Sequence, residues 1–360
     1  MVSQRLGWIG VDVGTHAVKL AQVVRDAGGV RLHRAAVMQR PTSWPTSDRL
    51  AFDQPVSSVV EIRAARQCGR FVGRNAVCSL PMNACQLRGL SVPPGENDER
   101  RSMIADELAA EWAEQRVAME FDFWELETAS PDKSSDGFNV NMLAIARPWI
   151  LQLARDCRQA GLDCWVVDGA PLAMARAVAL AGGLGGGQRA LAVDWGYSNT
   201  TLCVVGDGRP WYTRRVSDCA FGQALEAIAR RFDVALDQAQ FLADTHGIPS
   251  PTAEGAGDRA AQAAIAEAVE STVDNLRDHA RRTLHFLETQ RRHLHPVAIW
   301  LMGGGASMRY IGPWLEEALH LPVHIWNLPY ENESLSFAAG TRSALFAGAA
   351  ALSALAWRAA

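Results

Sequence analysis

Two copies of one short pattern place an acid, a glycine and hydroxyl or amide residues in the same order. The first copy runs from Trp8 to Lys19 and the second from Leu191 to Thr201. In each copy an apolar stretch leads into Asp-x-Gly, small polar residues follow, and a second apolar stretch comes next. The pattern predicts two β-hairpins with Asp12 and Asp194 beside their turns.

The residue types in these turns suit phosphate chemistry. Glycine lets backbone N–H groups come close to a ligand, and successive N–H groups can bind an anion. Because a carboxylate would repel a bare phosphate, the two aspartates indicate an intervening Mg²⁺, which prefers oxygen ligands. The alternative is an ordinary hairpin turn, in which Asp and Gly are common.

A third element of the sequence argues against ordinary hairpin turns. The apolar stretch Val297–Met302 leads directly into the glycine-rich stretch Gly303–Met308, and Tyr310–Leu319 then has a helical pattern. A strand, a glycine run and a helix in this order let a nucleoside lie against bare backbone. A flexible glycine loop is the alternative interpretation.

The order of the three elements resembles the phosphate 1, phosphate 2 and adenosine motifs of the actin-like ATPase superfamily. Within it the chain resembles the PilM family of type IV pilus assembly proteins, relatives of the cell-division protein FtsA. Three further segments carry the resemblance, which extends over nearly the whole chain: Asn75–Pro81, Gly161–Asp163 and Val166–Ala173.

The resemblance implies an α/β actin-like ATPase fold, with two RNase H-like domains around a nucleotide cleft. We expect domain I over residues 1–181, domain II over 188–337, and a C-terminal helix within 338–360 that packs back on domain I. A β-β-α-β-β block at about 75–146 is expected to be the extra subdomain of FtsA and PilM proteins.

The resemblance also implies ATP and Mg²⁺ as ligands, with Asp12 and Asp194 holding the metal through water. Lys19 is expected to reach the β- or γ-phosphate. His16, where the family often has serine, could donate to phosphate or be a simple exposed turn residue. The full set of expected nucleotide-binding residues is Asp12, Gly14, Thr15, His16, Lys19, Asp194, Gly196, Ser198, Asn199, Thr200, Gly303, Gly304, Gly305 and Ala306.

Two departures from the superfamily bear on turnover and affinity. Actin-like ATPases orient the attacking water with Gln or Glu at the start of a connecting helix, but Ala146–Ile150 holds neither. Gln152 lies one turn further on. Relatives often carry an adenine-recognising lysine where this chain has Gln240–Asp244. We therefore expect a nucleotide-binding scaffold with slow turnover or none.

The expected partner is the cytoplasmic N-terminal segment of a PilN-like inner-membrane protein, bound in a groove beside the extra subdomain. The protein is then cytoplasmic and peripheral to the inner membrane, with membrane association through partners alone. Self-association is a further expectation by superfamily analogy. The alternatives are a sugar- or acetate-type kinase, an FtsA-like protein and a protein like GspL of type II secretion.

Composition favours a globular protein of two or more domains. Of 360 residues, 48% are hydrophobic and 21% charged, and the net charge is −4. The absence of a basic patch argues against nucleic acid as a partner. Seven cysteines without a Cys-x-x-Cys spacing suggest reduced thiols in the cytoplasm, and no signal peptide is evident. The apolar stretch Ser343–Trp357 is short for a membrane span of ~20 residues, so we expect a buried helix.

Periodicity predicts the elements that must position these residues. Ile104, Leu108 and Trp112 recur on one face of a helix over Asp98–Arg116, and a long helix is expected over residues 259–291. Helices are also expected near 56–67, Ile150–Cys157, Leu172–Leu180 and Gly222–Phe232. The expected strands include Leu6–Val11, Val18–Val24, Val30–Met38, Val72–Leu80, Cys85–Val92, Phe121–Glu127 and Val140–Ala146.

Overall fold

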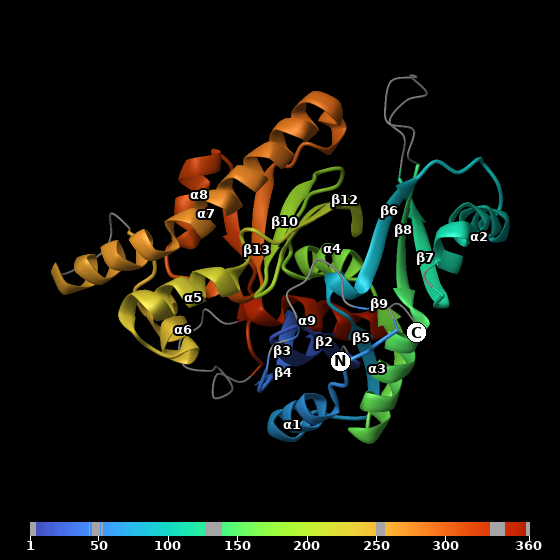
Figure 1. The fold of residues 1–360 in the computed structure, drawn as a ribbon, viewed down its shortest axis with the longest axis horizontal. Helices are drawn as coiled ribbons and strands as arrows, with labels where there is room; N and C mark the ends of the chain where they lie inside the picture. Colours follow the sequence, from blue (N-terminus) through green and yellow to red (C-terminus); the bar gives the residue numbers. More distant parts are fainter. Residues whose placement is uncertain are drawn as a thin grey trace.

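Three separate β-sheets organise the chain (Figure 1). The computed structural model describes residues 5–42, 44, 51, 53–114, 116–126, 139–249, 256–331 and 343–357. Glu127 and residues 338–342, which belong to predicted elements, lie outside this part of the chain.

The first sheet contains the hairpin that carries Asp12. Its central strands β2 and β3 are antiparallel and pair Asp12 with Lys19, and β5 runs parallel to β2. The predicted strand over Leu6–Val11 is split in two, because the Trp8 N–H turns aside to donate to the Ser353 carbonyl. The order is β1-β3-β2-β5-β9, with β4 on β3, and the strands are β1 (Arg5–Leu6), β2 (Ile9–Val13), β3 (Ala17–Asp26), β4 (Gly29–Gln39), β5 (Asn75–Ser79) and β9 (Asp163–Asp168).

Helices cover both faces of this sheet. Residues Ile9, Val11 and Val13 of β2 alternate inward to a core shared with α1 (Val59–Gly69) and α3 (Arg147–Gln159). The other face receives α9 (Ala347–Ser353), whose flanking turns are 3₁₀ helices at Ser343–Phe346 and Ala354–Trp357. Gly10 makes this contact possible, since a Cβ there would lie 1.9 Å from the Ala349 carbonyl oxygen.

The second sheet repeats the hairpin around Asp194 and has the order β12-β11-β10-β13-β14. Strands β10 and β11 are antiparallel, while β13 runs parallel to β10, as β5 does to β2. The strands are β10 (Ala190–Trp195), β11 (Thr200–Gly206), β12 (Arg209–Val216), β13 (Ala298–Met302) and β14 (Val323–Ile325). The helices of this half are α5 (Phe221–Phe232), α6 (Leu236–Thr245), α7 (Ala256–Gln290) and α8 (Ile311–Leu319).

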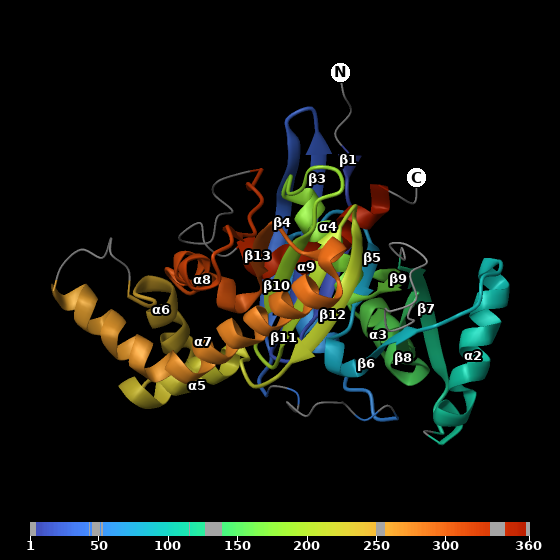
Figure 2. The same ribbon diagram turned by 90° about the horizontal axis from the view of Figure 1, so that it is seen from above.

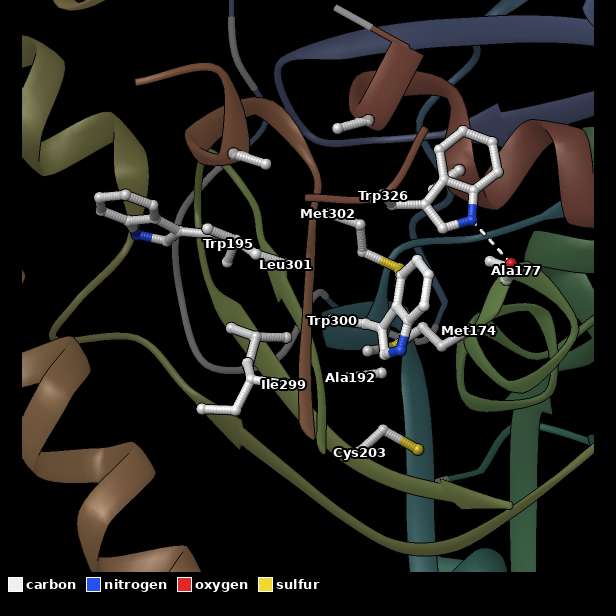
Figure 3. Close-up of a cluster of buried hydrophobic side chains, with 14 of the residues drawn as sticks. Met174, Ala177, Ala192, Trp195, Cys203, Ile299, Trp300, Leu301, Met302 and Trp326 are labelled. Carbon is white, nitrogen blue, oxygen red and sulfur yellow. Dashed lines mark hydrogen bonds between the residues drawn. The ribbon is translucent and has the colours of Figure 1, made fainter. Parts of the chain in front are cut away.

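The core joins the two halves through α4 (Ala170–Leu180), which contacts β10, β11, β12 and α9. Figure 3 shows Met174 of α4 beside Trp300 of β13, a strand buried on both faces. The Trp326 indole donates to the Ala177 carbonyl at 2.7 Å, as the dashed line shows. One continuous cluster of buried side chains therefore spans both halves.

The third sheet is small and separate, with the order β6-β8-β7. It consists of β6 (Cys85–Leu90), β7 (Met119–Glu125) and β8 (Val140–Ala146). The predicted face of α2 (Asn97–Glu114) packs on it through Ile104 and Leu108. Figures 1 and 2 both show this unit on the opposite side of the molecule from α6 and α7.

The predicted start of this block at residue 75 is wrong. β5 lies in the first sheet, between β2 and β9, so the separate sheet begins at Cys85. The strands that begin at Asn75 and at Cys85 are both apolar, so their sequences do not distinguish their pairing partners, which depend on the tertiary structure.

No helix in the described part of the chain is long and apolar enough to cross a membrane.

Candidate functional site

The two hairpin turns are built in the same way. The Gly14 N–H donates to the Ala17 carbonyl at 3.0 Å, and the Gly196 N–H donates to the Asn199 carbonyl at 3.1 Å. A Cβ at either glycine would lie 2.8 Å from that same oxygen, so both turns require glycine. These two N–H groups therefore close the turns.

The turns open into one cavity of about 650 Å³, which we call the central cavity. Its size is typical of small-molecule sites. Both turns, the end of β5, the start of α4, and helices α5 and α6 contribute to its wall. Ten expected residues line it: Asp12, Gly14, Thr15, His16, Lys19, Asp194, Gly196, Ser198, Asn199 and Gly304.

Four expected residues lie outside this lining. Gly303 borders a small adjoining space together with Asp12 and Asp194. Thr200 is fully buried, and its hydroxyl donates to the Cys219 carbonyl at 3.1 Å. Gly305 packs against the Trp195 ring, and a Cβ on residue 305 would lie 2.3 Å from that ring. Ala306 is buried. The glycine run thus packs against the β10 end more than it faces the cavity.

A lysine and two carboxylates form the charged centre of the cavity. The Lys19 ammonium lies 2.7 Å from Asp12 Oδ2, and Ser79 Oγ donates to Asp12 Oδ1 at 3.2 Å. Burial by itself would lower the pKa of Lys19, but the charges of Asp12 and Asp194 outweigh it, so this pKa is raised. Burial raises the pKa of Asp194, although Lys19 opposes the change.

The tips of the two turns touch each other. Thr15 Oγ1 lies 2.5 Å from Ser198 Oγ, and the His16 ring stacks on Tyr197 with centroids 3.8 Å apart and 9° between the planes. His16 is therefore half-buried rather than freely exposed. Burial lowers its pKa, and the charges of Arg40 and Lys19 lower it further. At neutral pH the ring is uncharged and lies against the opposite turn.

Arg40 supports the first turn and lines the central cavity, and no pattern in the sequence pointed to it. Its Nε donates to the Gly14 carbonyl at 3.0 Å and its Nη2 to Ser58 Oγ at 2.9 Å. The guanidinium also lies 3.5 Å from Glu61 Oε2 and stacks over Trp44 at 4.1 Å. Arg40 follows β4 in a Pro- and Ser-rich stretch, where no periodicity marks a buried cation.

A polar group from α6 and the end of the glycine run forms part of the cavity wall. Gln240 Nε2 donates to Asp244 Oδ1 at 2.6 Å and to Ser307 Oγ at 3.1 Å, and Ser307 Oγ lies 2.6 Å from the same carboxylate oxygen. Gln240 and Ser307 line the cavity. Gln240 belongs to the segment Gln240–Asp244, which lacks the adenine-recognising lysine that relatives often carry.

Helix α3, whose start was predicted to lack a water-orienting Gln or Glu, lies away from the central cavity. None of residues 146–152 lines the central cavity, and Gln152 donates instead to Asp156 within α3. The helix that does begin at the cavity is α4, through Ala170. Its first residue carries neither an acid nor an amide.

Known proteins share this architecture. A family model described as type IV pilus assembly protein PilM matches residues 10–352. No curated protein matches the sequence. Among solved structures, a PilM–PilN type IV pilus biogenesis complex is similar with a TM-score of 0.70 and 23% identity, over 97% of this chain and 98% of that one. The ethanolamine utilization protein EutJ from Carboxydothermus hydrogenoformans is similar with a TM-score of 0.52 and 13% identity, over 97% and 89%.

The fold is thus that of the actin-like ATPases, as the family resemblance implied. Since the family model covers nearly the whole sequence, the chain belongs to the family of type IV pilus assembly proteins PilM.

Proposed function

We propose that this chain is an ATP-binding scaffold of the type IV pilus machinery. It docks the cytoplasmic N-terminal segment of a PilN-like inner-membrane protein and is held at the inner membrane by that partner. The observation that carries the proposal is the convergence of both Asp-x-Gly turns on one cavity, in a chain of the PilM family.

The donor set fits a magnesium nucleotide. Asp12 and Asp194 supply carboxylate oxygens, which Mg²⁺ prefers, and Lys19 supplies a cation for a terminal phosphate. The Thr15 and Ser198 hydroxyls face each other where the two turns meet. Gln240 and Ser307 provide amide and hydroxyl groups on the cavity wall, where a base or ribose could be held. This arrangement supports binding, while Ala170 supplies no group for hydrolysis.

The third sheet supports partner docking. Its order leaves β6 and β7 as outer strands, and an extended peptide can pair with such a strand through main-chain hydrogen bonds. The similar solved structure is a complex of PilM with PilN. The Trp124 indole in β7 donates to the Pro210 carbonyl in β12 at 2.9 Å, so this sheet contacts the half that carries Asp194. This hydrogen bond is the contact through which we propose that nucleotide binding acts on the docking region.

ATP binding is tested by calorimetry with and without Mg²⁺. The double change Asp12→Ala with Asp194→Ala should abolish Mg²⁺-dependent binding, because both carboxylates are lost. Asp207→Ala is a matched control, since Asp207, like Asp12, pairs with a basic side chain beside a hairpin turn but lies on the surface. Unchanged affinity in the double variant would disprove the nucleotide site.

Docking is tested by capture of a PilN-type N-terminal peptide, with ATP present and then absent. Two variants alter exposed positions of the third-sheet unit: Met103→Lys on α2, and Glu120→Lys with Asp122→Lys on β7. Glu317→Lys on α8 is the control. We expect weaker capture with at least one of the first two and no change with the control. Loss with the control alone would place the interface on the other half.

A further inference from the structure

Three cysteines from distant parts of the sequence meet beneath the first sheet. Cys78 lies in β5, Cys157 in α3 and Cys164 in β9. The Cys78 and Cys157 sulfurs are 3.5 Å apart, and all three sulfurs lie within 4.8 Å of one another. We call this group the thiol cluster. It lies outside the central cavity, and the proposed nucleotide chemistry does not use it.

Buried cysteine often acts as a small apolar side chain, so packing is the alternative. Two features go beyond packing. Cys78 and Cys157 are fully buried, but Cys164 is only half-buried on the edge strand β9, which gives the group a side open to solvent. The three sulfurs also lie within 4.8 Å of one another, whereas a single buried thiol such as Cys203 contacts a threonine hydroxyl instead.

We propose that Cys78, Cys157 and Cys164 form a three-sulfur site for a soft monovalent metal ion, Cu(I). A metal–sulfur bond of about 2.3 Å in a trigonal plane separates the sulfurs by roughly 4 Å, which agrees with the cluster. Soft thiolate ligands select Cu(I) and Zn²⁺.

Ligand number favours the monovalent ion. Structural Zn²⁺ is bound by four ligands, and no fourth His, Cys, Asp or Glu of the described residues joins this group. Three sulfur ligands alone therefore favour Cu(I) over Zn²⁺.

The test is an anaerobic titration of the full chain with Cu(I) against a coloured Cu(I) chelator. Wild type should bind one equivalent. Cys164→Ser and Cys157→Ser should each weaken binding by on the order of 100-fold, since even loss of an outer-sphere partner costs 10- to 100-fold. Cys68→Ser, on the surface, and Cys203→Ser, buried in the second sheet, are controls that should leave affinity unchanged.

Thermal denaturation separates binding from folding defects. Cu(I) should raise the melting temperature of wild type and of both controls, because it binds the folded state, and should not raise that of Cys164→Ser. Three results would overturn the proposal: no bound equivalent in wild type, undiminished binding by Cys164→Ser, or tighter binding of Zn²⁺ than of Cu(I).

Discussion

Gly303, next to the central cavity, occupies a backbone position that leaves no room for a Cβ. Its φ is 86° and its ψ is −175°, a region that is essentially restricted to glycine. A Cβ there would lie 2.2 Å from Asp194 Oδ1 and 2.9 Å from the Trp195 carbonyl oxygen. Gly303→Ala should therefore strain the backbone and displace the Asp194 carboxylate as well.

The magnitude follows from these two effects. Backbone strain in this region costs about 1–3 kcal/mol and overpacking about 1–3 kcal/mol more, so the free energy of unfolding should fall by about 2–6 kcal/mol. An unfolding entropy of about 2.1 cal/mol/K per residue gives roughly 0.76 kcal/mol/K for 360 residues. The melting temperature should then fall by about 3–8 °C.

Gly73→Ala is the matched control. Gly73 has a φ of 83°, but a Cβ there would meet nothing within 4 Å. The left-handed strain should lower the free energy of unfolding of this variant by only about 1–2 kcal/mol and its melting temperature by about 1–3 °C. The variant should bind magnesium nucleotide normally. Differential scanning calorimetry and isothermal titration with Mg²⁺-ATP measure both effects. If Gly303→Ala matches Gly73→Ala in both assays, the close approach of residue 303 to Asp194 affects neither stability nor nucleotide binding.

Three further outcomes are expected. Phosphate release by the pure protein should be far slower than about 10 s⁻¹, because Ala170 at the start of α4 cannot orient a water; a rate near that value would reveal an unrecognised catalytic residue. Gly10→Ala should lower the melting temperature by several degrees or prevent folding, since its Cβ would overlap the Ala349 carbonyl in α9, and an unchanged melting curve would contradict the packing. Stability in urea should fall as pH drops below about 6.5, because the lowered pKa of His16 makes the unfolded state bind more protons there, and His16→Gln should flatten this slope.

Local patterns predicted the elements that carry the site. Both hairpins were expected from an acid, a glycine and alternating apolar residues within twelve positions, and the structure confirms the pairing of Asp12 with Lys19 and of Asp194 with Thr201. The inward face of α2, with Ile104 and Leu108, is confirmed too. Such features are predictable because turn chemistry and side-chain periodicity act over a few residues.

Other site residues gave no such signal. Arg40, Tyr197 and Gln240 reach the cavity from a loop, a turn tip and a helix face, and each is placed by contacts with residues far away in sequence. The same reason explains why the predicted extra subdomain wrongly included β5, whose apolar pattern fits either sheet. The ligand roles of the lining residues stay predictions that the experiments above test.

The sequence by itself determined two Asp-x-Gly hairpin turns, a glycine run after a third strand, and the family to which they belong. Tertiary structure decided which sheet each strand joins, which helix begins at the cavity, and which glycines line the cavity rather than pack against a neighbouring side chain. Hairpin turns are encoded locally. The meeting of Thr15 with Ser198, or of three thiols beneath one sheet, exists only when distant segments pack together and bury their apolar faces.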